Sequence, residues 1–253
     1  MNPQNDLFGY LLEYRDLKLD QLGDPLLELA GHVDWEAFRP VLNKVRTKDR
    51  KSPAGRKPWD VVLMFKALVL ANLYNLSDEQ LEFQIEDRRS FQRFIGLSDA
   101  KHAPDRNSYW LFRESIKTLK LTEILFKEFN RQLDRAGLIA RKGQLIDASF
   151  IKAPIQHNTP EENARIKAGE TIDEWSKHKS SQKDMDARWG KKGKNSYYGY
   201  KNHVNVDNTN KLVRQYSVTD ASVHDSQELE GLLDSGNTSV DVWADSAYRS
   251  ESI

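Results

Sequence analysis

Cysteine is absent from the chain, which has 253 residues. Without thiols the protein can form neither a disulfide framework nor a zinc site built on thiolates. A chain of this length can bury a sizeable apolar core without such cross-links. The absence of cysteine therefore argues against a disulfide-rich secreted domain and fits a reducing cytoplasm.

A long hydrophobic run is also missing. The longest, residues 61–73, is interrupted by Lys66 and Asn72 and is shorter than the ~20 residues that a membrane-spanning helix needs. The first residues, MNPQNDLFGY, have neither the basic start nor the apolar core of a signal peptide. We therefore expect a soluble, cytoplasmic protein with no membrane partner.

Net charge is the third property that the chain lacks, because 38 basic residues balance 38 acidic residues. A general attraction to nucleic acid is therefore not expected. The distribution is uneven: residues 39–57 hold eight basic residues and one acid, and residues 188–201 hold five basic residues and no acid. Such segments contact phosphate in some proteins and are solvated faces in others, and both interpretations stay open. The candidates for DNA-backbone contacts in the first segment are Arg46, Lys48, Arg50, Lys51, Arg56 and Lys57.

Residues 1–137 have the apolar periodicity of helices. Pro58 suits the first turn of one helix, Ser77 and Gln80 form a capping-box pattern at the start of the next, and Gly137 suits a helix end. Two helices joined by a short turn are compatible with a helix-turn-helix, although any helical hairpin has this pattern. We expect residues 1–137 to form an all-helical domain, and the pattern alone leaves DNA binding open.

After Gly137 the apolar residues follow the two-residue period of strands. The expected strands are residues 145–151, 200–206, 212–218 and 240–244, with a helix before the last. Residues 153–196 are polar and charged, which favours an insertion or a mobile loop.

This order of elements is that of the front of a ribonuclease-H-like sheet, in which the last strand lies parallel beside the first. The predicted fold class is α+β or α/β: an all-helical domain followed, over residues 138–253, by an incomplete ribonuclease-H-like mixed sheet.

Two aspartates are candidates for a metal site. Asp147 lies among strand-forming apolar residues, where a buried and unpaired charge is costly, and Asp245 follows the last expected strand. If the two strands are neighbours, both carboxylates face one metal ion. Taken separately, Asp147 is also explained as a turn cap and Asp245 as a helix cap.

Three stretches resemble, in order and spacing, the bacterial DDE transposases of the insertion-sequence-five family: LIDASFIKAP, GYKNHVNVDNTNKLVRQYSVTDASVHDSQEL and VDVWADSAYRS. The stretches GRKPWDVVLMFKALVLANLYNLSDEQLEFQIEDRRSFQRFIGL and PDRNSYWLFR resemble the N-terminal DNA-binding region of that family. The resemblance covers nearly all of the chain. It implies that Asp147 and Asp245 are the first two catalytic and metal-binding members of an Asp-Asp-Glu triad.

The same resemblance implies Mg²⁺ as cofactor, at a two-metal site in the complete enzyme, and a reaction that cleaves DNA and transfers strands. The implied partners are terminal inverted repeats, target DNA and further copies of the chain, as a homodimer or larger assembly on the bacterial nucleoid. Lys201 and His203 resemble residues near the active centre that meet DNA phosphate, although a solvated hairpin face explains them equally well. His224 and Asp225 match a family motif, but we leave them out of the catalytic set because Asp225 is also an ordinary capping choice.

The chain departs from the family pattern after Asp245. The family's glutamate lies on a later helix, whereas only eight residues follow Asp245, and Glu251 lacks the expected spacing. We therefore expect a C-terminally truncated transposase with weak or absent catalysis. Two other functions stay open: a non-catalytic fragment that binds terminal repeats or oligomerises and so regulates transposition, and a metal-dependent phosphohydrolase.

Overall fold

A computed structural model describes residues 3–46, 57–97, 102–153, 157–170, 172 and 174–248. The chain divides into two compact units, Met1–Gln132 and Leu133–Ile253, and each is described by itself. The division lies inside a helix, a few residues before the boundary that the change of periodicity suggested.

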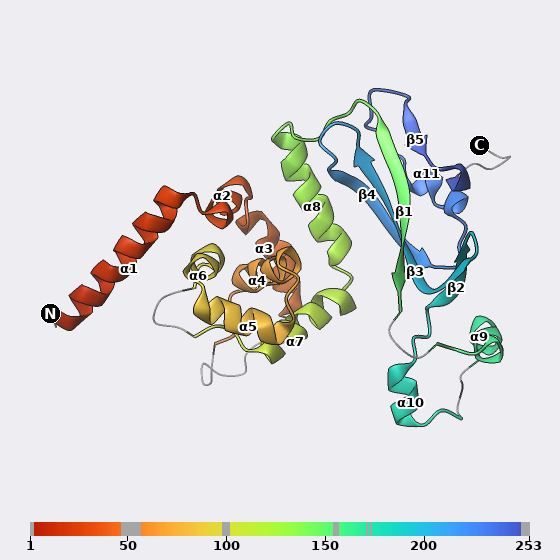
Figure 1. Cartoon of the computed structure of the whole chain (residues 1–253), viewed down its shortest axis with the longest axis horizontal. Helices are drawn as coiled ribbons and strands as arrows, with labels where there is room; N and C mark the ends of the chain where they lie inside the picture. The colour runs from red at the N-terminus through yellow and green to blue at the C-terminus, as the bar shows by residue number, and fades with distance from the viewer. Residues whose placement is uncertain are drawn as a thin grey trace. The chain divides into compact units, whose positions relative to one another are not determined.

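The first unit is helical, as the sequence predicted (Figure 1). In chain order it contains α1 (Pro3–Leu22), α2 (Pro25–His32), the short run η1 (Glu36–Phe38), α3 (Arg39–Leu42) and η2 (Asn43–Val45), then α4 (Val61–Leu73), α5 (Asp78–Asp87), α6 (Arg89–Ile95), α7 (Arg106–Thr118) and α8 (Thr122–Arg135), which crosses the division.

Side-chain caps set several of these helix starts. The capping box of Ser77 and Gln80 is confirmed, since each side chain accepts a hydrogen bond from the other residue's backbone N–H. The prediction for Pro58 is wrong, because it precedes the helix. Asp60 caps α4 instead, and its carboxylate accepts from the N–H groups of Val62 and Leu63.

The core of this unit is apolar and continuous. Phe38, Leu81, Phe94 and Tyr109 are each at most 1 % exposed and belong to a single cluster that extends from α2 to α8. Helix α4 lies within it and buries seven of its residues. In the described part of the chain, no single helix is long and apolar enough to cross a membrane; α4 and α5 together have the length and composition, but a 105° bend separates them.

The second unit is a mixed sheet with short helices. Its elements are β1 (Gln144–Lys152), α9 (Pro160–Lys167), α10 (Lys177–Gln182), β2 (Arg188–Lys192), β3 (Asn195–Asp207), β4 (Val213–Asp220), η3 (Asp225–Gln227), α11 (Leu229–Leu232), β5 (Val242–Ala244) and η4 (Ser246–Tyr248). β1 is central, with β3 antiparallel on one side and β5 parallel on the other. This is the ribonuclease-H-like arrangement that the order of strands predicted.

Of the two interpretations of residues 153–196, an insertion or a mobile loop, the loop is wrong for the parts that form helices and strands. The segment contains α9 and α10, and its last part is β2, which pairs antiparallel with the first residues of β3. β2 and β4 lie one after the other along the edge of β3 that faces away from β1. The crossover helix is also shorter than expected, because α11 has only four residues.

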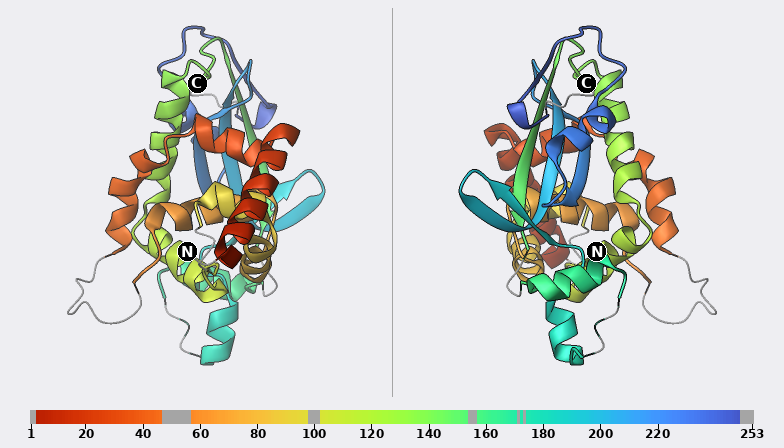
Figure 2. Two further views of the ribbon diagram at one scale, coloured as in Figure 1. Left: turned by 90° about the vertical axis from the view of Figure 1, so that its left-hand side faces the viewer. Right: turned by 90° about the vertical axis from the view of Figure 1, so that its right-hand side faces the viewer.

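One face of the sheet is covered by the crossover segment (Figure 2). Ile146 of β1 packs there with Leu232 of α11 and Tyr248 of η4, and all three are at most 3 % exposed. We call this side the covered face. Because side chains alternate along a strand, Asp147 is directed to the other face.

Candidate active site and nucleic-acid interface

Asp147 occupies the middle of β1 and is solvent-exposed. It pairs across the sheet with Val204 of β3, and its Oδ1 accepts a hydrogen bond from the N–H of Ala148 at 2.8 Å. The expectation of a buried strand around it is wrong, because the side of β1 that carries Asp147 is open in this unit. The turn-cap explanation is also wrong, since the residue lies within a regular ladder.

Asp245 directly follows β5, the strand that lies parallel beside β1. Gln144 is opposite Val242, and Ile146 is opposite Ala244, which is the last pair of this ladder. Asp147 and Asp245 are the next residues along the two chain segments, and neighbouring strands lie ~4.8 Å apart. Each aspartate therefore comes directly after the last pair of the ladder.

The helix-cap explanation for Asp245 is confirmed, and it does not remove the residue from the site. Its Oδ1 accepts from the N–H of Ala247 at 2.8 Å, at the start of η4. This bond orients the carboxylate. Within the described residues Oδ2 has no hydrogen-bond partner, so one oxygen positions the side chain and the other is available.

Segment η4 is anchored to the covered face by a buried tyrosine. The Tyr248 hydroxyl lies 3.3 Å from Nδ1 of His203, and Nε2 of that ring lies 3.0 Å from the Thr219 hydroxyl. His203 is fully buried, and burial lowers the pKa of its ring, so the neutral form is favoured. Burial, followed by the charge of nearby carboxylates, raises the pKa of Tyr248. The contact therefore joins two neutral groups and holds η4 against β3.

Lys201 lies next to His203 on the covered face. Its Nζ donates to the Val223 carbonyl and to Oδ1 of Asp225, both at 2.7 Å, and it is 7 % exposed. The alternative of a solvated face for Lys201 and His203 is therefore wrong, and their contact with DNA phosphate stays a prediction. Both residues are interior, and their polar atoms are committed to partners within the unit, because the crossover segment covers this side of β3.

The covered face contains further polar residues that sequence reasoning missed. Asn205 is fully buried, and its amide donates to the side chain of Gln144 and to the carbonyl of Leu232. The signal was present in the alternation of β3, whose odd-numbered residues are polar. The alternation does not show which face of β3 is buried. That face is identified only by its contacts with the crossover segment and η4, which are distant in the sequence.

The two aspartates fit a divalent ion as a partial ligand set. Carboxylate oxygens are the ligands that Mg²⁺ prefers, and one or two carboxylates with water and substrate phosphate complete many such sites. Within the described ranges no group of three or more acidic or histidine residues is arranged to hold a metal. Glu251, the weak candidate for a third ligand, lies outside those ranges.

The basic segment before α4 is described only at its ends. Arg46 and Lys57 are both exposed, and a guanidinium nitrogen of Arg46 donates to the carbonyl of Trp59. The other four candidates, Lys48, Arg50, Lys51 and Arg56, lie outside the described residues. At its two described ends this segment is therefore accessible to a phosphate backbone.

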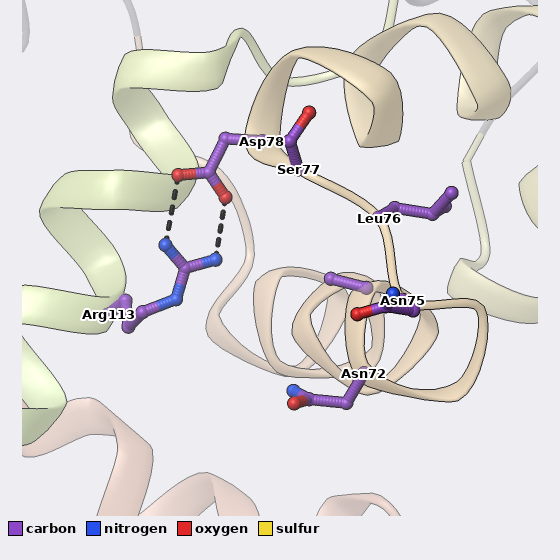
Figure 3. A pocket seen from close by; sticks show the side chains of 7 residues that line it. Asn72, Asn75, Leu76, Ser77, Asp78 and Arg113 are labelled. Carbon is purple, nitrogen blue, oxygen red and sulfur yellow. Dashed lines mark hydrogen bonds and ion pairs between the residues drawn. The ribbon is translucent and has the colours of Figure 1, made fainter. Parts of the chain in front are cut away.

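Helices α4 and α5 meet at the angle of a helix-turn-helix, but the second helix lacks the basic residues that a DNA-recognition helix usually has. They meet at 105°, within the ~90–120° typical of that motif. A pocket of about 470 Å³ lies at the turn, where Arg113 of α7 binds both carboxylate oxygens of Asp78 (Figure 3). Helix α5 has five acidic and no basic residues, so it is poorly suited to lie in a DNA groove.

Two family models match the chain. Residues 14–115 match the model described as Transposase domain (DUF772), and residues 140–253 match the Transposase DDE domain. No solved structure matches the chain. The second match includes both Asp147 and Asp245, and the first includes most of the helical unit.

Proposed function

Because the chain belongs to the DDE transposases, we propose that it cleaves DNA at the ends of an insertion sequence and transfers the strands in a Mg²⁺-dependent reaction. The observation that supports this is the parallel ladder of β1 and β5, whose last pair, Ile146 and Ala244, directly precedes Asp147 and Asp245. An ion held by their oxygens would activate water or a DNA 3′-hydroxyl and stabilise the leaving oxygen. The family implies DNA as partner; terminal inverted repeats and target DNA are the specific partners that we propose.

The protein's own contribution is to fix the two carboxylates. Asp147 is held by the ladder with β3, in which it pairs with Val204. Asp245 is held by its cap on η4, and η4 is held by Tyr248 in the sheet interior. Rigid placement of this kind lets two carboxylates bind an ion without first losing conformational freedom.

The test uses the whole chain and DNA that includes the sequences flanking its gene. We expect Mg²⁺-dependent strand cleavage that is lost in Asp147→Asn and in Asp245→Asn. Asp241→Asn is the matched control, because it removes the same charge from an exposed residue just before β5. Cleavage that survives in both site variants would contradict the proposed role.

The alternative is a non-catalytic protein that binds terminal repeats and regulates transposition. It is favoured by one observation, that no third acid joins the pair in the part of the chain that the structure describes. In that case the same assay would give DNA binding without cleavage, and binding would be unchanged in Asp147→Asn and Asp245→Asn.

We also propose that the basic segment at residues 39–57 binds the DNA backbone. Removing one cation that neutralises a phosphate should reduce the slope of log affinity against log salt concentration by about 1. Arg46→Ala and Lys57→Ala test the two described ends. Lys117→Ala is the control, because Lys117 is an exposed residue of α7, and it should leave the slope unchanged.

A further inference from the structure

Helix α1 is attached to the rest of its unit by one side only. The half-buried residues of that side are Leu12, Asp16 and Leu19. Ion pairs hold it: Asp16 pairs with Arg89 at 2.7 Å and with Arg93 at 3.7 Å, and Asp20 pairs with Arg93 at 2.6 Å. The arginines belong to α6, so the acidic side of α1 already has its partners.

The opposite side of α1 is apolar and exposed. Tyr10, Tyr14 and Leu17 are 65 %, 61 % and 56 % exposed. Each precedes a residue of the attached side by two positions, or about 200° around the helix. Figure 1 shows α1 extending from α2 at the margin of the helical unit. An apolar stripe of this kind on a surface helix marks a contact with another molecule.

The charge of the region argues against DNA or an acidic membrane as that molecule. Residues 1–36 contain eight acidic and two basic residues. Phosphate groups would be repelled by this surface. A protein partner with its own apolar stripe fits better.

The spacing of the stripe points to another copy of the same helix. Tyr10, Tyr14 and Leu17 are separated by four and then three residues, which is the seam of a two-stranded coiled coil. We propose that α1 pairs in parallel with α1 of a second copy of this chain. This pairing does not depend on the proposed metal chemistry.

The charged residues beside the seam determine the direction of the pair. In a parallel pair Glu13 of each helix faces Lys18 of the other, because residues flanking the seam meet five positions apart. In an antiparallel pair Glu13 would face acidic residues, Asp20 or the second Glu13. Neither Glu13 nor Lys18 has an ion pair within the described residues, so both are available to a partner helix.

The proposed interface is short. A stable protein interface buries about 1,200–2,000 Å² in total, and one helix pair with three seam residues on each side is smaller. We therefore expect a dissociation constant on the order of 10 µM or weaker for the full chain without DNA. Binding of two copies to neighbouring DNA sites would strengthen the pairing through effective concentration.

Cross-linking tests the pairing directly, since the chain has no cysteine of its own. Tyr14→Cys places one thiol on the seam, where a parallel pair brings the two Cα atoms within the ~7 Å limit for a disulfide. Arg15→Cys is the control, because that residue is also exposed but lies about 100° away around the helix. We expect mild oxidation to yield several times more covalent dimer from Tyr14→Cys. Equal yields from both variants would overturn the proposal.

Charge reversal tests the direction and the partner. In sedimentation equilibrium of the full chain, Glu13→Lys and Lys18→Glu should each weaken dimerisation ~3-fold or more, and the double variant should restore it. A double variant as monomeric as the single variants would overturn the parallel pairing. The proposal would also be overturned if these variants change the affinity for DNA while the sedimentation result stays unchanged, because α1 would then contact DNA.

Discussion

The two units of this protein are stabilised in different ways. The helical unit has one continuous apolar cluster, whereas the sheet unit has two clusters of three buried residues each. Among the described residues, the seven polar or charged residues that are buried as whole residues all lie in the sheet unit. The stability of the helical unit therefore depends mainly on apolar packing. The stability of the sheet unit depends also on hydrogen bonds and ion pairs between polar groups of distant segments.

That difference is relevant to function. An apolar core tolerates exchange of similar side chains, but a buried polar network fixes one arrangement, because any unpaired member costs free energy. In the sheet unit this network adjoins η4 and the cap at Asp245. The part of the sheet unit that is fixed by this polar network is therefore the part that carries the proposed metal-binding aspartates.

The largest effect is expected from removing a core side chain of the helical unit. Phe94 is fully buried and packs edge-on against Trp35, so Phe94→Ala should lower the free energy of unfolding of this unit by about 3–5 kcal/mol. Hydrogen exchange resolved by peptide measures each unit separately. Phe83→Ala is the control, since Phe83 is 64 % exposed, and should change stability by less than about 0.5 kcal/mol. Equal effects of the two variants would disprove the packing account.

A smaller effect is expected from breaking the buried ion pair of the sheet unit. Lys201→Met leaves the Asp225 carboxylate without its cation, at 15 % side-chain exposure, and should cost about 2–3 kcal/mol. The matched variant Lys201→Met with Asp225→Asn removes both charges and should regain part of that stability. The two residues are not coupled if the loss of stability in the double variant equals the sum of the losses in Lys201→Met and Asp225→Asn measured separately.

The smallest effect is a pH dependence confined to the sheet unit. The folded pKa of His203 is lowered by burial, so the unfolded chain binds a proton more readily than the folded chain does. The stability that neutral His203 gives to the folded sheet unit is therefore complete above about pH 6.5, the pKa of histidine in the unfolded chain. This stability is lost as the pH falls below that value. Hydrogen exchange at pH 7 and pH 5.5, corrected for intrinsic rates, should detect loss of protection in β3. His203→Gln should abolish this pH dependence. If the dependence persists in that variant, another titrating group causes it.

Local signals in the sequence predicted much of the fold. Ser77 caps α5, and Gly137 has a positive φ after α8. Each of these depends on backbone geometry within a few residues. The order of strands was sufficient to predict that β5 lies parallel beside β1.

The sequence did not predict which side of β3 is buried. Lys201 finds its partner 24 residues away and His203 finds Tyr248 45 residues away, so no local pattern distinguishes a buried polar face from a solvated one. Strand β2 was missed for a related reason. Its residues are mostly basic, with a glycine at the centre, and only pairing with β3 makes them a strand.

The central claim is that Asp147 and Asp245 form one divalent-metal site. Binding of Mn²⁺ to the full chain, followed by electron paramagnetic resonance, tests it without DNA or turnover. The account predicts that Asp147→Asn and Asp245→Asn each weaken binding ~10-fold or more, and that Asp241→Asn binds like the unchanged protein. Equal Mn²⁺ affinity in all four proteins would contradict it.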